Sequence, residues 1–135
     1  MRTRAPISYR AILEGLAYAL REAKERIETK SKVAISNLRV SGGGPQSDVA
    51  MQLTADIFRL PTARPHTFET AGLGAAIAGA VGLGLHRDFP AAVRAKSRLR
   101  RVSKPDPSYT GMYEELYRQV YCQRYDRLGP LYTKL

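Results

Sequence analysis

The sequence predicts an α/β fold in which helices cover a small, mostly parallel sheet. Helical spacing of apolar residues alternates with short β-prone runs, in the order helix, strand, helix, strand, helix, and the connections are short. The chain has 135 residues, of which 44% are hydrophobic and 25% charged, as in a globular domain. Because two strands are fewer than most sheets contain, we expect the chain to form part of a domain.

The first predicted helix runs from about Ser8 to Glu28. Its apolar residues recur at spacings of three and four and form one stripe, which consists of Ile12, Leu16, Leu20, Ala23 and Ile27. The β-prone run VAISNLRV at residues 33–40 follows and predicts the first strand, which ends at Val40.

A glycine-rich turn, SGGGPQSD at residues 41–48, joins this strand to a second helix. Ser47 is a candidate N-cap, and the helix is expected to continue to about Phe58. The residues expected on its buried face are Val49, Leu53 and Ile57. Glycine loses more conformational freedom on folding than any other residue, so three in succession indicate an unusual turn or a close neighbour.

Residues 61–64 predict a second strand, which Pro65 keeps short. Glu69 and Thr70 then open a helix rich in glycine and alanine, with Thr70 as a possible cap. The uncharged run at residues 71–85 is 15 residues long, shorter than the ~20 that a membrane span needs. We therefore expect a buried helix, packed closely through its small residues, and no membrane span.

Two further helices are predicted after this run. The first is short and spans Pro90 to about Lys96, with its proline in the first turn. The second closes the chain over about residues 107–128, where Gly129 and Pro130 are expected to stop it. It carries a tyrosine at every fourth position: Tyr109, Tyr113, Tyr117, Tyr121 and Tyr125. This row fits either base stacking or packing across a domain with the phenol groups in water, and we favour the packing.

The remaining composition limits the functional classes. Cys122 is the single cysteine, so an internal disulfide is excluded and a reduced compartment, the cytoplasm, is expected. His66 and His86 stand apart without metal-ligand spacing, so no metal site is expected within the chain. The first residues lack the continuous apolar core of a secretion signal.

The net charge of +10 is concentrated in part of the chain. Residues 94–104 (RAKSRLRRVSK) hold six basic residues and no acidic one. Such a run can bind the phosphates of a nucleic acid, and a small basic nucleic-acid-binding module is an alternative function. Without interleaved aromatic residues or a recognition helix, we favour a solvated connector and consider nucleic acid an improbable partner.

The glycine turn also has the chemistry of a nucleotide site. A bare backbone allows close approach, and the helix that follows presents amide groups and a partial positive charge to an anion. The turn lacks the Gly-Lys-Ser/Thr ending of a P-loop and the third glycine of the dinucleotide fingerprint. Taken by itself, it fits nucleotide binding and a structural turn equally well.

A longer stretch resembles the C-terminal region of the FGGY family of carbohydrate kinases. Several segments follow in the order of that family. They are YRAILEGLAYALRE, RVSGGGPQS, MQLTADIF with Gln52 and Asp56, LPTARP, ETAGLGAAIAGAVGLGL and PDPSYTGMYEELYRQVY. The resemblance covers nearly all of the chain.

This resemblance implies an actin-like ATPase domain of the ribonuclease H-like class, and a kinase that transfers the γ-phosphate of ATP to a sugar or polyol hydroxyl. It implies that the glycine turn approaches ATP and that Ser47 lies at the adenosine. The implied nucleotide-binding residues are Gly42, Gly43, Gly44, Gln46 and Ser47. The small residues Gly74, Ala75 and Ala76 are expected to pack against the sheet.

The family's catalytic aspartate and its turns for phosphate and magnesium match no segment of this sequence. We therefore expect residues 1–135 to be the C-terminal part of the nucleotide-binding lobe, without catalytic residues or magnesium ligands of their own. The expected partners are ATP, magnesium, a sugar or polyol bound by another lobe, and either that lobe or further copies of the chain. A catalytically dead remnant is a further alternative.

Overall fold

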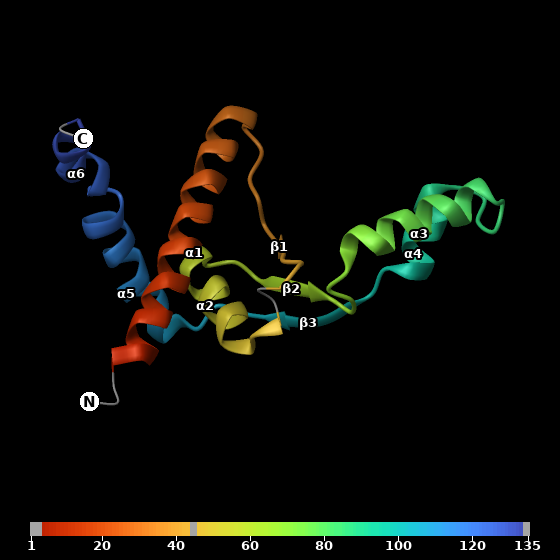
Figure 1. Cartoon of the computed structure of the whole chain (residues 1–135), viewed down its shortest axis with the longest axis horizontal. Helices are drawn as coiled ribbons and strands as arrows, with labels where there is room; N and C mark the ends of the chain where they lie inside the picture. Colours follow the sequence, from red (N-terminus) through yellow and green to blue (C-terminus); the bar gives the residue numbers. More distant parts are fainter. Residues whose placement is uncertain (1–3, 44–45, 134–135) are drawn as a thin grey trace.

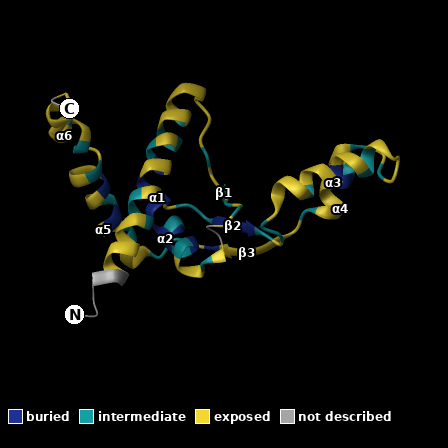
Figure 2. Ribbon diagram, viewed as in Figure 1, coloured by how far each residue is buried: buried dark blue, intermediate teal, exposed yellow. Residues whose placement is uncertain are grey.

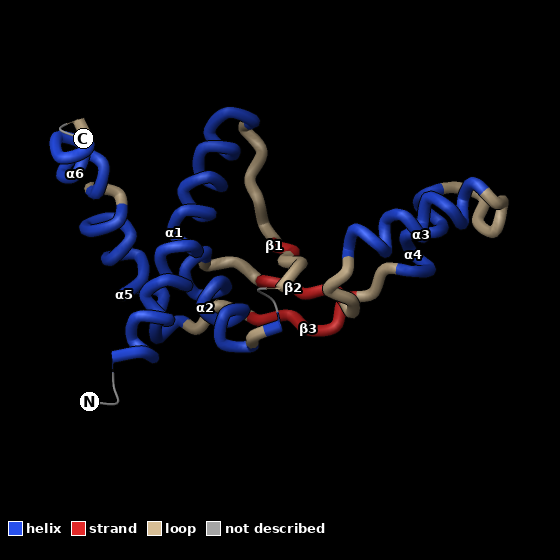
Figure 3. The backbone as a smooth tube through the Cα atoms, viewed as in Figure 1, coloured by secondary structure: helices blue, strands red, loops and turns tan. Residues whose placement is uncertain are grey.

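The fold is described from a computed structural model covering residues 4–43 and 46–133 (Figures 1 and 3). The elements are α1 (Arg4–Ser31), β1 (Leu38–Arg39), α2 (Asp48–Phe58), β2 (Thr62–Pro65), α3 (Thr70–Gly82), α4 (Phe89–Lys96), β3 (Leu99–Ser103), α5 (Pro107–Leu116), the π-helical turn η2 (Tyr117–Tyr121) and α6 (Arg124–Tyr132).

The described residues form a three-stranded sheet in the order β1-β2-β3. β1 and β2 are parallel and α2 connects them, whereas β2 and β3 are antiparallel. The predicted α/β class is confirmed, and the sheet is mixed rather than mostly parallel. β3 was not predicted, because its arginines interrupt the apolar pattern of a strand. This part of the basic run is exposed as expected, but it is an edge strand of the sheet and not a connector.

β1 is shorter than the strand predicted at residues 33–40. Its ladder to β2 includes hydrogen bonds from Leu38 N to Pro61 O (3.0 Å) and from Val40 N to Ala63 O (2.9 Å). Among the described residues no strand pairs with the other edge of β1. The prediction was wrong in length because strand pairing depends on a neighbour as well as on local sequence.

The core lies where α1, α2, α5 and η2 meet (Figure 2). It consists of Ala17, Tyr18, Leu53, Ile57, Phe58, Tyr113 and Tyr117. Tyr18 and Tyr117 lie with their ring centroids 5.7 Å apart, within the range of favourable aromatic pairs. Two of the five tyrosines in the predicted row, Tyr113 and Tyr117, are therefore buried in the core.

The first predicted helix is present as α1, but its predicted apolar stripe is largely exposed. Ala17, Tyr18 and Arg21 are the residues that α1 buries. The four large residues of the stripe are between 55% and 63% exposed: Ile12, Leu16, Leu20 and Ile27. Periodicity identified an apolar face that the described elements leave uncovered.

A buried arginine joins α1 to the elements that pack against it. Arg21 donates to the carbonyl of Ile57 at 3.0 Å and forms ion pairs with Glu25 at 3.1 Å and Glu114 at 2.5 Å. Its guanidinium carbon lies 4.1 Å from the ring centroid of Tyr117, a cation–π distance. One side chain therefore links α1 with α2, α5 and η2.

α3 and α4 form a separate helical arm at one end of the molecule (Figure 1). Ile77 is the buried residue of α3, and most of the helix is exposed (Figure 2). The prediction of a buried helix was wrong, because the main packing partner of α3 is α4, at a distance from the core. Glu69, not Thr70, precedes its first turn, and makes no side-chain cap. No helix within the described ranges is long and apolar enough to cross a membrane.

The C-terminal segment is not one helix over residues 107–128. α5 is followed by η2, where Cys122 N bonds to Tyr117 O at 2.9 Å, and then by α6. α6 continues through Pro130, and Thr133 N bonds to Gly129 O at 3.2 Å. The prediction that Gly129 and Pro130 stop the helix was wrong, because the turn closes again beyond the proline.

Acid is expected to weaken the junction of α1 with η2 and α6. Arg124 donates to Glu22 at 2.7 Å, and this hydrogen bond holds the pKa of Glu22 below its ordinary value of 4.5. A lowered folded-state pKa stabilises the fold above the unfolded pKa, and the contribution disappears as the pH falls through the folded pKa. Urea unfolding between about pH 6 and pH 3 should show less loss of stability in Glu22→Gln than in the wild type. Parallel pH profiles for the two proteins would contradict this expectation.

Candidate functional site

The glycine turn leads from β1 into the N-terminus of α2. Gly42 has a φ of +93°, a conformation that residues with a Cβ rarely adopt. The Gln46 amide donates to Gly43 O at 3.3 Å and closes the turn. Gly43 is exposed, and a Cβ added to it would meet nothing within 4 Å. Gly44, also predicted to bind nucleotide, lies outside the described residues.

Ser47 is the N-cap of α2, as predicted. Its hydroxyl accepts a hydrogen bond from Ala50 N at 3.3 Å, and its carbonyl accepts one from Met51 N at 3.1 Å. The cap satisfies one amide of the first turn, and the partial positive charge of the helix end remains beside the hydroxyl. The turn therefore offers an anion or a sugar a bare backbone, a hydroxyl group and a favourable field.

Two arginines fix the start of α2 to the sheet. Asp48 pairs with Arg64 of β2 at 2.8 Å and with Arg101 of β3 at 2.6 Å. The Arg64 side chain is buried, whereas the other two are more than half exposed. The two pairs occupy the carboxylate, so Asp48 positions the turn and is not available as a catalytic base.

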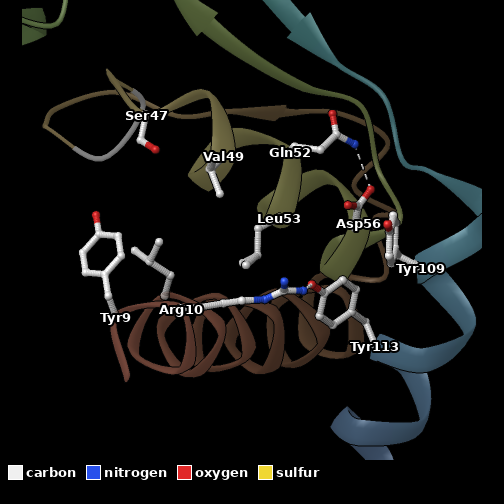
Figure 4. A pocket seen from close by; sticks show the side chains of 10 residues that line it. Tyr9, Arg10, Ser47, Val49, Gln52, Leu53, Asp56, Tyr109 and Tyr113 are labelled. Carbon is white, nitrogen blue, oxygen red and sulfur yellow. Dashed lines mark hydrogen bonds between the residues drawn. The ribbon is translucent and has the colours of Figure 1, made fainter. Parts of the chain in front are cut away.

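An open groove of about 570 Å³ runs between α1, the start of α2 and α5 (Figure 4). Ser47 lies at one end of the groove, which connects it to the glycine turn. The lining residues are Tyr9, Arg10, Leu13, Ser47, Val49, Gln52, Leu53, Asp56, Tyr109 and Tyr113. Most of the lining is apolar or aromatic, as in a small-molecule site.

Arg10 is the cation of this groove. It donates to Glu14 at 2.9 Å and to the Tyr113 hydroxyl at 2.8 Å. The hydrogen bond to Glu14, and to a smaller extent the one to Tyr113, raises the pKa of Arg10 above its ordinary value. Burial raises the pKa of Tyr113, against the opposing effect of Arg10. Near neutral pH Arg10 is therefore charged and Tyr113 neutral, so the pair can bind but not exchange protons.

Asp56 is the buried carboxylate of the groove and has a structural role. Its Oδ1 accepts hydrogen bonds from Gln52 Nε2 at 2.9 Å and from Asp106 N at 2.7 Å. Asp106 in turn caps α5 through a bond from Ser108 N at 2.9 Å. Asp56 therefore holds the beginning of α5 against α2. Among the described residues, no group of three or more His, Cys, Asp or Glu side chains could hold a metal ion.

The structure brings four of the five predicted residues into one turn: Gly42, Gly43, Gln46 and Ser47. Sequence reasoning missed the groove beside them, because Tyr9, Arg10, Tyr109 and Tyr113 come from the two ends of the chain. No spacing pattern joins residues that lie about one hundred positions apart. The hydrogen bond from Arg10 to Tyr113 is visible only after α1 and α5 have packed.

Comparison with known proteins gives matches to one family. The family model described as "FGGY family of carbohydrate kinases, C-terminal domain" matches residues 1–83. An uncharacterized sugar kinase, YgcE, from Escherichia coli is 34% identical over 84% of this chain and 23% of its own length. A glycerol kinase from Saccharolobus islandicus is 34% identical over 88% of this chain and 22% of its length.

A solved structure extends the agreement to the fold. Ligand-bound xylulose kinase from Lactobacillus acidophilus aligns with a TM-score of 0.80 and 26% identity over 97% of this chain and 26% of its own. The chain thus spans about a quarter of the length of the curated relatives it matches. The α/β fragment has the actin-like ATPase fold of these sugar kinases.

Proposed function

The chain belongs to the FGGY family of carbohydrate kinases, and we propose that its turn at residues 41–47 binds the adenosine part of ATP. In this proposal Gly42, Gly43 and Gly44 let the nucleotide approach the backbone, while Gln46 and Ser47 contact it at the helix end. The reaction served is transfer of the γ-phosphate of ATP to a hydroxyl of a sugar or polyol.

The observation that carries the proposal is the position of the exposed glycine turn, directly before the N-terminus of α2. A Cβ at the exposed Gly43 would meet nothing within 4 Å, so packing in the described structure does not require glycine there. The backbone is instead left bare beside the N-terminus of α2, where the helix field favours a phosphate or a polar sugar. The described glycines all have such room, so the proposal depends on where Gly43 lies: in an exposed turn beside the capped end of α2.

Phosphate transfer is proposed to need more polypeptide than these 135 residues. A kinase must hold the nucleophile, base, metal and phosphates together, mainly through positioning and electrostatics. The described aspartates near the turn, Asp48 and Asp56, already bind other groups of the protein. We therefore propose that the chain forms the C-terminal part of a nucleotide-binding lobe. The sugar, the base and the magnesium are held by another lobe.

Gly43→Val is expected to weaken ATP binding at least about tenfold without unfolding the protein. The added side chain would occupy the space that the nucleotide enters, which costs more than about 1.4 kcal/mol of binding free energy if the contact is direct. Isothermal titration calorimetry with ATP measures the affinity, and circular dichroism checks the fold. Ser47→Ala should weaken both the helix cap, by about 1 kcal/mol, and the nucleotide contact.

Gly79→Ala is the matched control, because a Cβ there also meets nothing within 4 Å and the residue lies on the distant arm. It should leave ATP affinity unchanged. Equal affinities for wild type and Gly43→Val would overturn the proposal. Parallel titration with an oligonucleotide at several salt concentrations tests the alternative, because nucleic-acid binding through the basic run would weaken steeply with salt.

A further inference from the structure

Two arginines lie directly opposite each other in the antiparallel part of the sheet. Arg64 of β2 is in register with Arg101 of β3. Like charges on directly opposed residues destabilise a sheet, so this arrangement needs compensation. Asp48 supplies it, because Oδ1 lies 2.8 Å from Arg64 Nη1 and Oδ2 lies 2.6 Å from Arg101 Nη1. Each carboxylate oxygen is thus paired with a different strand, and we refer to these three residues as the ion-pair bridge.

The sheet beside the ion-pair bridge is irregular. The register shifts next to Arg64, because Pro65 is opposite Leu99 and Arg100 has no residue opposite it. Bulges of this kind redirect side chains and are common next to functional sites. A short strand that contains both a bulge and a cross-strand arginine pair departs from the usual rules of sheet formation. Such departures are expected where a residue serves a function and not only the fold.

The position of the ion-pair bridge indicates which function this is. Asp48 is the first residue of α2 and directly follows the N-cap, Ser47. Arg64 is the last residue but one of β2, at the carboxyl end of a strand in the parallel part of the sheet. Ligands of open α/β sheets bind outside the carboxyl ends of such strands. The ion-pair bridge therefore fixes the start of α2 at the edge of the sheet where a ligand is expected.

The three side chains differ in exposure, which allows their contributions to be separated. The Arg64 side chain is 9% exposed, whereas those of Asp48 and Arg101 are 57% and 58% exposed. Exposed ion pairs contribute little to the stability of the whole fold, so Arg101 can be replaced without unfolding the chain. Within the described residues its guanidinium bonds to Asp48. An effect of Arg101 on the glycine turn is therefore expected to pass through Asp48.

We propose that Arg64 and Arg101 are positioning residues for the glycine turn and act on it through Asp48. Because Asp48 is paired with both strands, the first turn of α2 is held in one position against the sheet, together with Ser47. β3 thereby contributes to nucleotide affinity without touching the nucleotide, which gives part of the basic run a role. The inference rests on the proposed function and deepens it by naming residues outside the turn that set its affinity.

Adenosine is the probe for this inference, because it is uncharged and does not respond to the general loss of a positive charge. Arg101→Ala should weaken adenosine binding about threefold in isothermal titration calorimetry, the scale of one exposed ion pair. Arg100→Ala is the matched control, since it removes the same charge from an exposed position of the same strand but no bond to Asp48. It should leave the affinity unchanged. Arg101→Lys should restore most of the affinity, because the contact with Oδ2 needs one cationic donor.

A double-mutant cycle tests whether Arg101 acts through the carboxylate. Asp48→Asn should weaken adenosine binding at least as much as Arg101→Ala, because it removes both ion pairs. Adding Arg101→Ala to Asp48→Asn should then cause no further loss, since the two residues share one contact. Circular dichroism confirms that each variant is folded.

Hydrogen exchange in the free protein separates this inference from the adenosine proposal. The amides of Gln46, Ala50 and Met51 bond within the turn and the first turn of α2. They should exchange about threefold faster in Arg101→Ala than in Arg100→Ala. This exchange pattern in a protein that binds no adenosine would support the positioning role and overturn the adenosine proposal instead.

Two results would overturn the inference. The first is that Arg101→Ala and Arg100→Ala behave alike in adenosine affinity and in the exchange of these amides. The second is that the losses from Asp48→Asn and Arg101→Ala add in the double variant, because Arg101 would then act by a route other than Asp48.

Discussion

Replacing Arg21 with alanine is expected to lower the free energy of unfolding by about 3 kcal/mol, which is the usual cost of breaking a buried charge pair. The side chain is 8% exposed and bonds to Glu25, Glu114 and the carbonyl of Ile57. Truncation removes one donor from each of these acceptors and removes the guanidinium from the Tyr117 ring; Glu25 and Glu114 keep their contacts with Tyr117 and Arg118. Urea unfolding monitored by circular dichroism measures the loss.

Arg26→Ala is the matched control for this experiment. Arg26 lies on the same helix and also pairs with a glutamate, Glu22 at 2.6 Å, but its side chain is 71% exposed. Exposed pairs of this kind contribute about 0.5 kcal/mol or less. If the two variants lost the same stability, burial would not explain the effect and the central role of Arg21 would be wrong.

Ile57→Ala is expected to cost about 3 kcal/mol, within the range of about 2–5 for large-to-small core substitutions. Ile57 is 0% exposed and lies in the core beside Tyr117 and Phe58. Alanine removes three carbon atoms from this contact and leaves a cavity that rigid aromatic neighbours fill poorly. The midpoint of urea unfolding should fall accordingly, with the slope unchanged.

Val49→Ala separates burial from helix periodicity. Val49 and Ile57 were predicted on the same buried face of α2, yet Val49 is 68% exposed. Its replacement should change stability by less than about 0.5 kcal/mol, because surface substitutions rarely do more. A large loss in Val49→Ala would mean that another part of the molecule covers this position in solution.

The elements of the chain could largely be predicted, because helix and turn signals are local. The cap at Ser47 and the end of α2 at Phe58 follow from residue types within one or two turns. β3 could not be predicted, because an arginine-rich strand is stabilised by pairing with β2 and not by its own composition. The exposed stripe of α1 has the same origin: the sequence specifies an apolar face but not which neighbour is present to cover it.

The candidate site could likewise be predicted only in part. The glycine turn can be read from residues 41–47, since its signal is contiguous. The ion pairs of Asp48 involve Arg64 and Arg101, which are 16 and 53 positions away in the sequence. The groove is lined by residues from both ends of the chain. Long-range contacts of this kind have no periodicity, so only the packed structure reveals which charges fix the turn.

The two ion pairs of Asp48 also connect the glycine turn to the α3–α4 arm. The α3–α4 arm leaves the sheet at the end of β2 and returns at the beginning of β3, and His66 N bonds to Arg98 O at 2.9 Å where the two strands separate. Arg64 and Arg101 lie next to this junction, and both form ion pairs with Asp48, the neighbour of Ser47. The base of the arm is thus connected to the glycine turn by two ion pairs. The base of the arm and the residues proposed to hold adenosine are therefore joined through one carboxylate.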